Sequence, residues 1–402
     1  MVSRHILISG ASIAGPALAY WLHRFGFQAT VVERSPGLRP GGQAIDIRGV
    51  AKQVVRRMGL DEQVRAACTD TDGMSLVTRK NRRVATLRAD QFDGDGLIAE
   101  IEILRGDLSE VFHAASKHTT EYLFSDRIES LREDADGVDV RFASGLERRF
   151  DLVVGADGLH SGVRSLVFGP ESDFLHHLGH YVAFFTVPNR LGLNRWALGY
   201  GEPGVSVGIR SIHDNQEAMA FLSFRSPELD YDYRDIEAQK AMVRERFAGV
   251  AWETPWLLEH MGAAPDFFFD SCAQIQLESW SAGRVALLGD AAFCPSPLSG
   301  QGTSLAIVGA YVLAGELAAA QGNHVVAFAQ YQRTLRGFVA ANQKMGRDNA
   351  ANAAPASRLG VGAQYLVMAA LRYLPGKTLL MRKLLRAVND LELPDYANVV
   401  AS

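Results

Sequence analysis

Residues 151–164 read D-L-V-V-G-A-D-G-L-H-S-G-V-R, and this stretch decides the fold. Val153 and Val154 have the pattern of a short buried strand, which Gly155 ends. Asp157 follows with no evident structural duty, and Gly158 lets the backbone come close to a ligand. An apolar run that ends in glycines and an acid is typical of a nucleotide-facing loop at the carboxyl end of a strand. Because a glycine motif already stands at the N-terminus, the stretch indicates a second such loop, which a simple dinucleotide-binding domain would not need.

The N-terminal motif has the order of a βαβ unit. We expect a buried strand at His5–Ser9, a helix at Pro16–Phe25 and a second strand at Gln28–Glu33. The turn G-A-S-I-A-G at residues 10–15 places free N–H groups of a helix start beside a pyrophosphate. Glu33 stands where a ribose ligand is expected, which disfavours a 2′-phosphate. The predicted cofactor contacts of this unit are Gly10, Ser12 (where glycine is usual), Ile13, Ala14, Gly15, Glu33 and Arg34.

A third glycine-rich segment lies late in the chain. Gly283–Ala291 predicts a turn and a short strand that ends at Gly289-Asp290. A loop through Pro297 and Gly300 leads to a long apolar helix expected from about Thr303 to Ala320. The start of that helix again offers unpaired N–H groups and a partial positive charge, which would stabilise an anionic group.

Composition limits the class of protein. A chain of 402 residues can form two domains with a large core. The net charge of −4 argues against a broad nucleic-acid or anionic-membrane surface, and the one dense basic run, Arg79–Arg83, is expected at the exposed tip of a hairpin. Ala306–Ala320 is interrupted by Glu316 and is too short to cross a bilayer.

Cysteine usage and the N-terminus indicate a cytoplasmic protein. The three cysteines are far apart and form no C-x-x-C pair, so neither a disulfide framework nor a zinc site is predicted. The N-terminus leads straight into a strand without a charged-then-apolar leader. The run His176-His177-x-x-His180 has metal-like spacing but no carboxylate or cysteine beside it, so no metal site is predicted.

Together the three segments resemble the class A FAD-dependent monooxygenases, the aromatic hydroxylases typified by p-hydroxybenzoate hydroxylase. The order and spacing of the N-terminal motif, Asp157-Gly158 and Gly289-Asp290 carry the resemblance, which covers most of the chain. Ile103–Leu108 is similar to the family's I-x-R-x-x-L helix start, which implies that Arg105 reaches toward FAD. The other FAD contacts that the resemblance implies are Gly42 and Asp46 beside the isoalloxazine, Ile128, Asp157, Gly158, Gly289, Asp290 at the ribityl or diphosphate part, Pro297, Gly300, Gln301, Gly302 and Thr303.

Chain length and the G-G-x-x-x-D loop at Gly41–Asp46 are closest to the tetracycline-inactivating enzymes and related small hydroxylases. Phe293 stands where the family usually has histidine after G-D-A-A, and Thr303-Ser304 replaces the common x-Asn. The polar side chains that a tetracycline binder uses in its sheet are not evident in Tyr181–Pro188 or Ala218–Phe224, so tetracycline is not the predicted substrate.

The fold class implied is α/β. It comprises a Rossmann-like FAD-binding domain, a mainly antiparallel β-sheet substrate domain and a C-terminal helix that braces the two. The predicted boundaries are 1–75, 96–175 and 276–350 for the FAD-binding domain, 76–95 and 176–275 for the substrate domain, and 356–395 for the C-terminal helix.

The predicted substrate contacts are inferred from residue type alone. An aromatic lining is predicted from Phe184, Phe185, Phe221, Phe224, Phe267–Phe269 and Phe293, although each could instead be plain core. Arg195 and Arg210 are expected on sheet strands, where either could anchor a phenolate or carboxylate or else lie on the solvated surface.

The resemblance implies that NADH or NADPH reduces FAD, that O2 adds at flavin carbon C4a, and that the hydroperoxide hydroxylates an aromatic or polyketide-like small molecule. No catalytic side chain is required, and Pro297 and Gly300 form the loop at the active face. The nicotinamide nucleotide is expected to bind transiently to a monomer or homodimer, with no nucleic-acid or membrane partner. Two alternatives remain: a flavin dehydrogenase or reductase on the same scaffold, and a non-catalytic FAD-containing binding protein.

Overall fold

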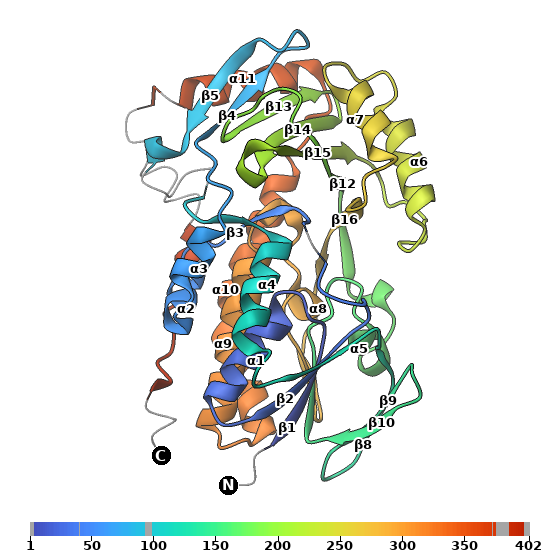
Figure 1. The fold of residues 1–402 in the computed structure, drawn as a ribbon, viewed down its shortest axis with the longest axis vertical. Coiled ribbons are helices and arrows are strands. Elements are labelled where there is room, and N and C mark those ends of the chain that lie inside the picture. Colours follow the sequence, from blue (N-terminus) through green and yellow to red (C-terminus); the bar gives the residue numbers. More distant parts are fainter. Residues whose placement is uncertain (1–3, 40, 93–98, 372, 375–385, 398–402) are drawn as a thin grey trace.

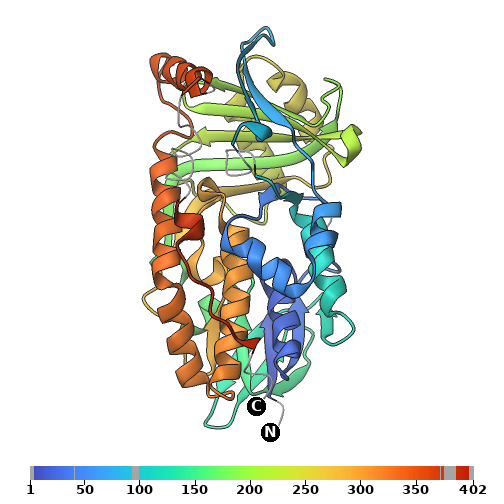
Figure 2. The ribbon, with the colours of Figure 1, turned by 90° about the vertical axis from the view of Figure 1, so that its left-hand side faces the viewer.

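Two sheets lie at opposite ends of the molecule in the computed structural model, which describes residues 4–39, 41–92, 99–371, 373–374 and 386–397 (Figure 1). A parallel sheet with its helices forms the FAD-binding domain, and a larger sheet forms the second domain. The long helix α10 runs beside the parallel sheet toward the second domain (Figure 2). The α/β class with two domains is therefore confirmed.

The parallel sheet has the strand order β17-β18-β11-β1-β2-β7, and only β17 and β18 pair antiparallel. The stretch quoted first supplies β11, which pairs with β1 from Ile6↔Leu152 to Ser9↔Gly155. Both strands are buried on both faces, as expected for the centre of a parallel sheet. The strands are β1 (His5–Ser9), β2 (Gln28–Glu33), β7 (Glu121–Phe124), β11 (Leu152–Gly155), β17 (Ser281–Ala282) and β18 (Val285–Leu287).

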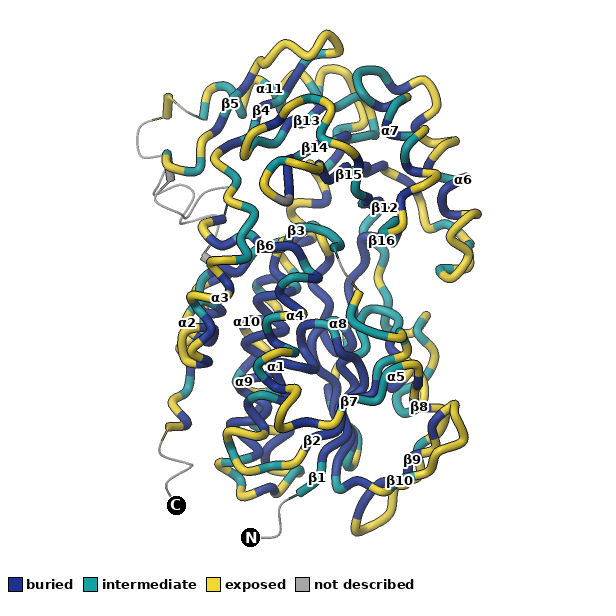
Figure 3. Tube along the Cα trace, viewed as in Figure 1, coloured by how far each residue is buried: buried dark blue, intermediate teal, exposed yellow. Residues whose placement is uncertain are grey.

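Helices cover this sheet. The apolar helix α9 is the one described helix long and apolar enough to cross a membrane, and 83% of it is buried inside the protein. Figure 3 shows this part of the chain as the most continuously buried. The helices of the domain are α1 (Ala14–Arg24), α2 (Val50–Met58), α3 (Asp61–Ala66), α4 (Arg105–Ser116), α5 (Gly162–Val167), α8 (Asp290–Phe293), α9 (Gly302–Ala319) and α10 (His324–Ala350).

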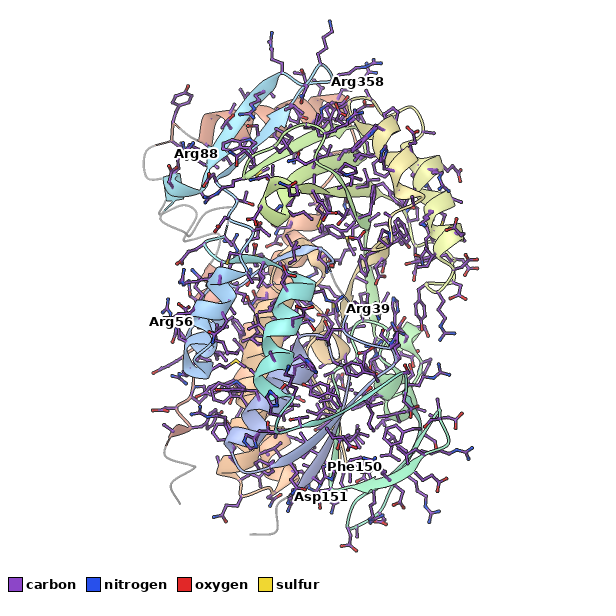
Figure 4. The ribbon with its side chains drawn as sticks, viewed as in Figure 1. Arg39, Arg56, Arg88, Phe150, Asp151 and Arg358 are labelled. Carbon is purple, nitrogen blue, oxygen red and sulfur yellow. The ribbon has the colours of Figure 1, made fainter. Side chains whose placement is uncertain are left out.

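Two smaller sheets belong to the same domain. A three-stranded antiparallel sheet lies at its outer end, near Phe150 and Asp151 in Figure 4. A two-stranded ribbon of β3 and β6 lies between the two domains (Figure 3). These strands are β8 (Ile128–Glu133), β9 (Val138–Phe142), β10 (Glu147–Phe150), β3 (Ala44–Asp46) and β6 (Glu102–Leu104).

The second domain is built on a seven-stranded sheet of order β16-β12-β15-β14-β13-β4-β5, in which only β13 and β4 pair parallel. The mainly antiparallel prediction is thus correct, but the predicted boundary after residue 75 cuts through β4. Arg79–Arg83 connects β4 to β5 at an exposed tip, as expected. The strands are β4 (Gly73–Val77), β5 (Arg83–Arg88), β12 (Leu175–Pro188), β13 (Trp196–Glu202), β14 (Val205–Ile212), β15 (Glu217–Arg225) and β16 (Phe268–Ile275).

The two faces of this sheet differ in what covers them. One face packs against α6 (Ile236–Phe247) and α7 (Thr254–Met261) and forms a closed hydrophobic core. The opposite face is turned toward the ribbon of β3 and β6, and the two meet through an apolar cluster that includes Leu104, Ile212 and Met219. The second face therefore borders the FAD-binding domain.

The C-terminal segment departs from its predicted role. Helix α11 (Arg358–Leu371) packs on β5 and β13 at the far end of the sheet, where Figure 4 labels Arg358. Residues 372 and 375–385 lie outside the described part, and the short helix η5 (Arg386–Asn389) packs against α10. Within the described chain α10 links the domains instead, since the carbonyl of Ala350 contacts the His180 ring of β12 at 2.9 Å.

Candidate functional site

Three loops meet at the carboxyl edge of the parallel sheet. Ala156 N donates to Ser9 O at 2.8 Å, and Leu288 N donates to Gly155 O at 2.8 Å, so the three glycine-rich segments lie side by side. Gly10 has a φ of +107°, and a Cβ there would lie 2.5 Å from Ala156 O. Only glycine allows this approach, which joins the first loop to the second.

Hydrogen bonds and close packing fix the N-terminal loop (residues 10–15) at the start of α1. Glu33 accepts hydrogen bonds from Ala11 N and Ser35 N, both at 2.9 Å. A Cβ on Gly15 would lie 1.9 Å from Gly10 O, so the helix start packs directly on the turn. No side chain caps α1, which leaves the N–H groups at its start available to an anion.

The two neighbours predicted with this loop have different surroundings. Arg34 is exposed on the surface next to Glu33. The Ile128 side chain is buried in the core of the domain, so its backbone is what it can offer a cofactor. Both stay predictions as cofactor contacts.

Arg105 and Asp290 are oppositely charged residues that lie close to each other where the three loops meet. Burial lowers the pKa of Arg105, although Asp290 and Glu33 oppose this electrostatically. Burial likewise raises the pKa of Asp290 against the effect of Arg105. Within the described residues the Arg105 guanidinium makes no hydrogen bond to protein, and a partly buried cation with free donors beside a helix start fits the diphosphate of FAD. Gly42, at φ +84°, lies against Arg105.

The loop before α9 presents backbone and one unpaired acceptor. Pro297 begins the short helix η4 (Pro297–Ser299), and Gly300 follows at φ +64°. Gln301 is buried, and its Oε1 has no hydrogen-bond partner in the described part of the chain. An orphaned acceptor next to the uncapped start of α9 fits the N–H and C=O edge of a flavin ring. Gly302 adjoins Asp290, and the side chain of Thr303 is buried in the first turn.

Asp157 does have a structural duty, contrary to the sequence-based expectation. Its carboxylate accepts from the Ser161 hydroxyl at 2.5 Å and from Val163 N at 3.1 Å, so it fixes the start of α5. Burial raises its pKa, while these hydrogen bonds oppose the rise. Gly158, at φ +85°, has open space where a Cβ would stand, so the backbone beside Asp157 is the part that can face a ligand.

Arg164 joins the second loop to the third, and the sequence reading missed this role. It is fully buried, and its guanidinium donates to Ala291 O at 3.0 Å, to Leu159 O at 2.7 Å and to Glu171 at 2.7 Å. The available signal was its place at the end of the quoted stretch, six residues after Gly158.

His160 links the two domains. Its ring contacts Glu171 at 2.8 Å and, across the boundary, Asp270 of β16 at 3.3 Å, and it stacks on Tyr233 at 4.3 Å. Burial lowers the pKa of His160, but hydrogen bonds to Asp270 and Glu171 outweigh this and raise it to about 10. No sequence pattern brought these residues together, since they come from distant segments.

A family model described as "FAD binding domain" matches residues 4–326. The chain is a class A FAD-dependent monooxygenase. It is 42% identical over 341 residues to a flavin-dependent monooxygenase of Legionella longbeachae, a match covering 85% of this chain and 87% of the relative. An uncharacterized protein of Mycobacterium tuberculosis is 48% identical over 351 residues, covering 87% of this chain and 94% of the relative.

Solved structures agree with this assignment. The tetracycline destructase Tet(55) superposes with a TM-score of 0.84 at 37% identity and covers 98% of this chain and 99% of its own. HpxO of Klebsiella pneumoniae, complexed with FAD and uric acid, shares the fold with a TM-score of 0.77 at 20% identity, covering 97% and 98% of the two chains. The monooxygenase family and FAD as its cofactor are therefore established for this chain.

The monooxygenase presents an aromatic surface on the sheet face that borders the FAD-binding domain. Phe221 lies there beside Phe184, with ring centroids 5.3 Å apart, and Phe268 adjoins Phe184 at 6.2 Å. All three rings remain partly exposed although they stand between the domains. Gly199 and Gly208 pair in register next to them and leave bare backbone. Of the predicted aromatics, Phe184, Phe221 and Phe268 lie on this face.

The other predicted aromatic contacts are corrected. Phe185, Phe224, Phe267 and Phe269 pack on the opposite face, in the core beneath α6 and α7. Alternation along a strand places Phe184 and Phe185 on opposite faces, and only the first borders the cofactor domain. Phe293 is buried inside the FAD-binding domain against Trp280, with centroids 4.7 Å apart, so the departure from histidine fills core space.

The two arginines considered as substrate anchors have different surroundings. Arg195 precedes β13 at φ +49°, with its side chain about half exposed and bound to Asp70 O and Asp72, so it is a surface residue. Arg210 lies on β14, as predicted, and is paired with Glu102 of β6. Asp46 pairs with Arg48 at 2.9 Å on the adjacent strand, so the predicted isoalloxazine contact is already engaged by protein.

The histidine run carries structural contacts. His177 and His180 of β12 bind the backbone carbonyls of Ser226 and Ala350. Among the described residues, no group of three or more potential ligands could hold a metal ion.

Proposed function

We propose that this monooxygenase uses NADH or NADPH to reduce FAD and hydroxylates an aromatic or polyketide-like small molecule. One observation carries the proposal: the cofactor loops at the carboxyl edge of the parallel sheet border a sheet face with three partly exposed phenylalanines and two glycines. Ring faces and bare backbone suit a flat substrate that must lie close to the flavin.

The protein's contribution is binding, orientation and exclusion of water. FAD, when bound, supplies the redox chemistry, taking a hydride from the nicotinamide and activating O2 at carbon C4a. Arg105 would hold the diphosphate, and the uncapped start of α9 would stabilise negative charge on the pyrimidine part of the reduced ring. Phe184, Phe221 and Phe268 would shield the reacting atoms from water.

The nicotinamide nucleotide would be a transient partner. The described residues form one βαβ dinucleotide unit, at the N-terminus, and FAD accounts for it. Likeness to Tet(55) supports fused-ring polyketides as one substrate class, so tetracycline is a useful member of any test panel.

The test is turnover by purified, FAD-loaded protein. NADH and NADPH oxidation, O2 uptake and product mass are measured with a panel of simple phenols and fused aromatic rings. We expect a subset of rings to stimulate nicotinamide oxidation and to gain one oxygen atom. Stimulated oxidation without any oxygenated product would instead establish a dehydrogenase or reductase.

A further inference from the structure

An ion pair between the two domains occupies the polar end of the aromatic sheet face. Arg210 of β14 is paired with Glu102 of β6, and their side chains are 20% and 12% exposed. Arg210 Nη2 also donates to Thr71 Oγ1 at 2.6 Å. The pair thus stands where the ribbon of β3 and β6 meets the sheet.

Glu102 is held as a carboxylate. The hydroxyls of Thr69 and Thr71 donate to its Oε1 at 2.6 and 2.9 Å, and Arg210 donates to the same oxygen. Burial raises the pKa of Glu102, but the charge of Arg210 and these hydrogen bonds outweigh burial and leave the pKa below its ordinary value. The carboxylate is therefore a permanent partner of Arg210 at neutral pH.

The charges around the pair cancel. Asp46 lies in register with Glu102 on the adjacent strand and carries its own partner, Arg48, at 2.9 Å. Two arginines therefore face two carboxylates at this end of the site. Because Asp46 is paired with Arg48, Glu102 is the carboxylate that neutralises Arg210.

One N–H donor of Arg210 is not used in a hydrogen bond within the described part of the chain. Its Nε is buried and has no hydrogen-bond partner in the described part of the chain. The residue lies on the substrate-facing side of the sheet, in register with Ala197 and Met219 and two positions after Gly208. A buried N–H without an acceptor is unfavourable, and a substrate oxygen that reaches it would supply the missing acceptor.

We propose that Glu102 determines the charge of the substrate: by neutralising Arg210 it makes this end of the site select a neutral carbonyl or hydroxyl oxygen and reject a ring carboxylate or phenolate. A lone buried arginine would favour an anion, but an anion here would approach Glu102 at close range, and like charges brought together in a water-poor site repel strongly. The inference deepens the proposed hydroxylase function and rests on it.

The test compares Glu102→Gln with wild type on ring pairs that differ only in a methyl against a carboxylate group. Glutamine keeps the shape and can still bind Thr69 and Thr71, so FAD content should be unchanged. We expect wild type to favour the neutral member at least tenfold in kcat/KM, and Glu102→Gln to reduce that preference about tenfold, mainly through a lower KM for the anion. Glu100→Gln, an exposed acid two residues earlier that pairs with Lys52, is the matched control and should keep the wild-type preference.

A measurement on wild type alone protects the test against a misfolded variant. A phenol whose own hydroxyl ionises between pH 6 and 9 should bind only as the neutral species, so its affinity should fall above the pKa of the phenol. Preference for the carboxylated member, or an unchanged preference in folded Glu102→Gln, would overturn the inference. Failure of the hydroxylase proposal is a different result, because then no ring of either charge would be oxygenated.

Discussion

The cofactor loops and the substrate face of the sheet are specified in different ways. The loops are specified by backbone: Gly10 and Gly15 stand where any Cβ would collide with a neighbouring carbonyl, and the motifs fix those positions locally. The sheet face is specified by side-chain alternation, so Phe184 and Phe185 serve opposite faces although they are neighbours in sequence. Local motifs therefore identify a cofactor site, whereas a substrate site depends on strand pairing between distant segments.

Arg164→Met should have the largest effect, because it breaks the connection between the second and third cofactor loops. The substitution removes the donor to Glu171 Oε2 and to two backbone carbonyls. We expect a loss of about 3–5 kcal/mol in the free energy of unfolding, measured in urea, together with reduced FAD content. Arg190→Met, which removes a more exposed partner of Glu253, should cost about 1 kcal/mol or less. Equal urea midpoints for the two variants would show that the loops do not depend on Arg164.

Phe185→Ala and Phe221→Ala test the two faces of the sheet against each other. Phe185 is fully buried, so its loss should cost about 3–5 kcal/mol of stability with KM unchanged. Phe221 is partly exposed beside Phe184, so its loss should cost less stability but raise KM for a ring substrate up to about tenfold. Urea unfolding and steady-state kinetics on both variants decide the assignment, and a KM effect confined to Phe185→Ala would reverse it.

This contrast explains what could be predicted from the sequence. The strands His5–Ser9 and Gln28–Glu33 and the three cofactor loops followed from local patterns, because each motif carries its own glycines and acid within a short stretch of sequence. Phe224 and Phe293 were placed wrongly, since a phenylalanine carries no mark of the face it will occupy. A shift of one residue in strand pairing reverses every side chain, and that pairing is set by contacts distant in sequence.

Polar contacts across the domain boundary could not be predicted from the sequence for the same reason. Glu102 and Arg210 are 108 positions apart in the chain, and His160 and Asp270 are 110 apart. The C-terminal segment shows a further limit: its apolar pattern predicted helix correctly at α11, but not that α10 would connect the domains.

His160→Gln should have a smaller, pH-dependent effect on the link between the domains. The pKa of His160 is raised to about 10 in the folded protein, above its ordinary value near 6.5. A raised pKa adds stability that is complete below about pH 6.5 and is lost as pH rises toward 10. Urea unfolding should therefore show wild type more stable than His160→Gln by up to a few kcal/mol near pH 6, with the difference shrinking above pH 8. His118→Gln, at an exposed site, is the control, and a constant difference for His160→Gln from pH 6 to 10 would contradict the charged contact.

Arg195→Ala should have the smallest effect, although Arg195 and Arg210 both belong to the sheet domain and were both candidate substrate anchors. The Arg195 side chain is about half exposed, and its partners Asp70 O and Asp72 lie at the surface, so its removal should change the free energy of unfolding by about 1 kcal/mol or less. KM for a ring substrate should not change, because the residue precedes β13 and does not lie on the aromatic face. Arg210→Ala should raise KM, since it removes the remaining donor and leaves Glu102 uncompensated. If Arg195→Ala raised KM as much as Arg210→Ala, the substrate surface would extend to the loop before β13, and the alternation of side chains would no longer mark its limit.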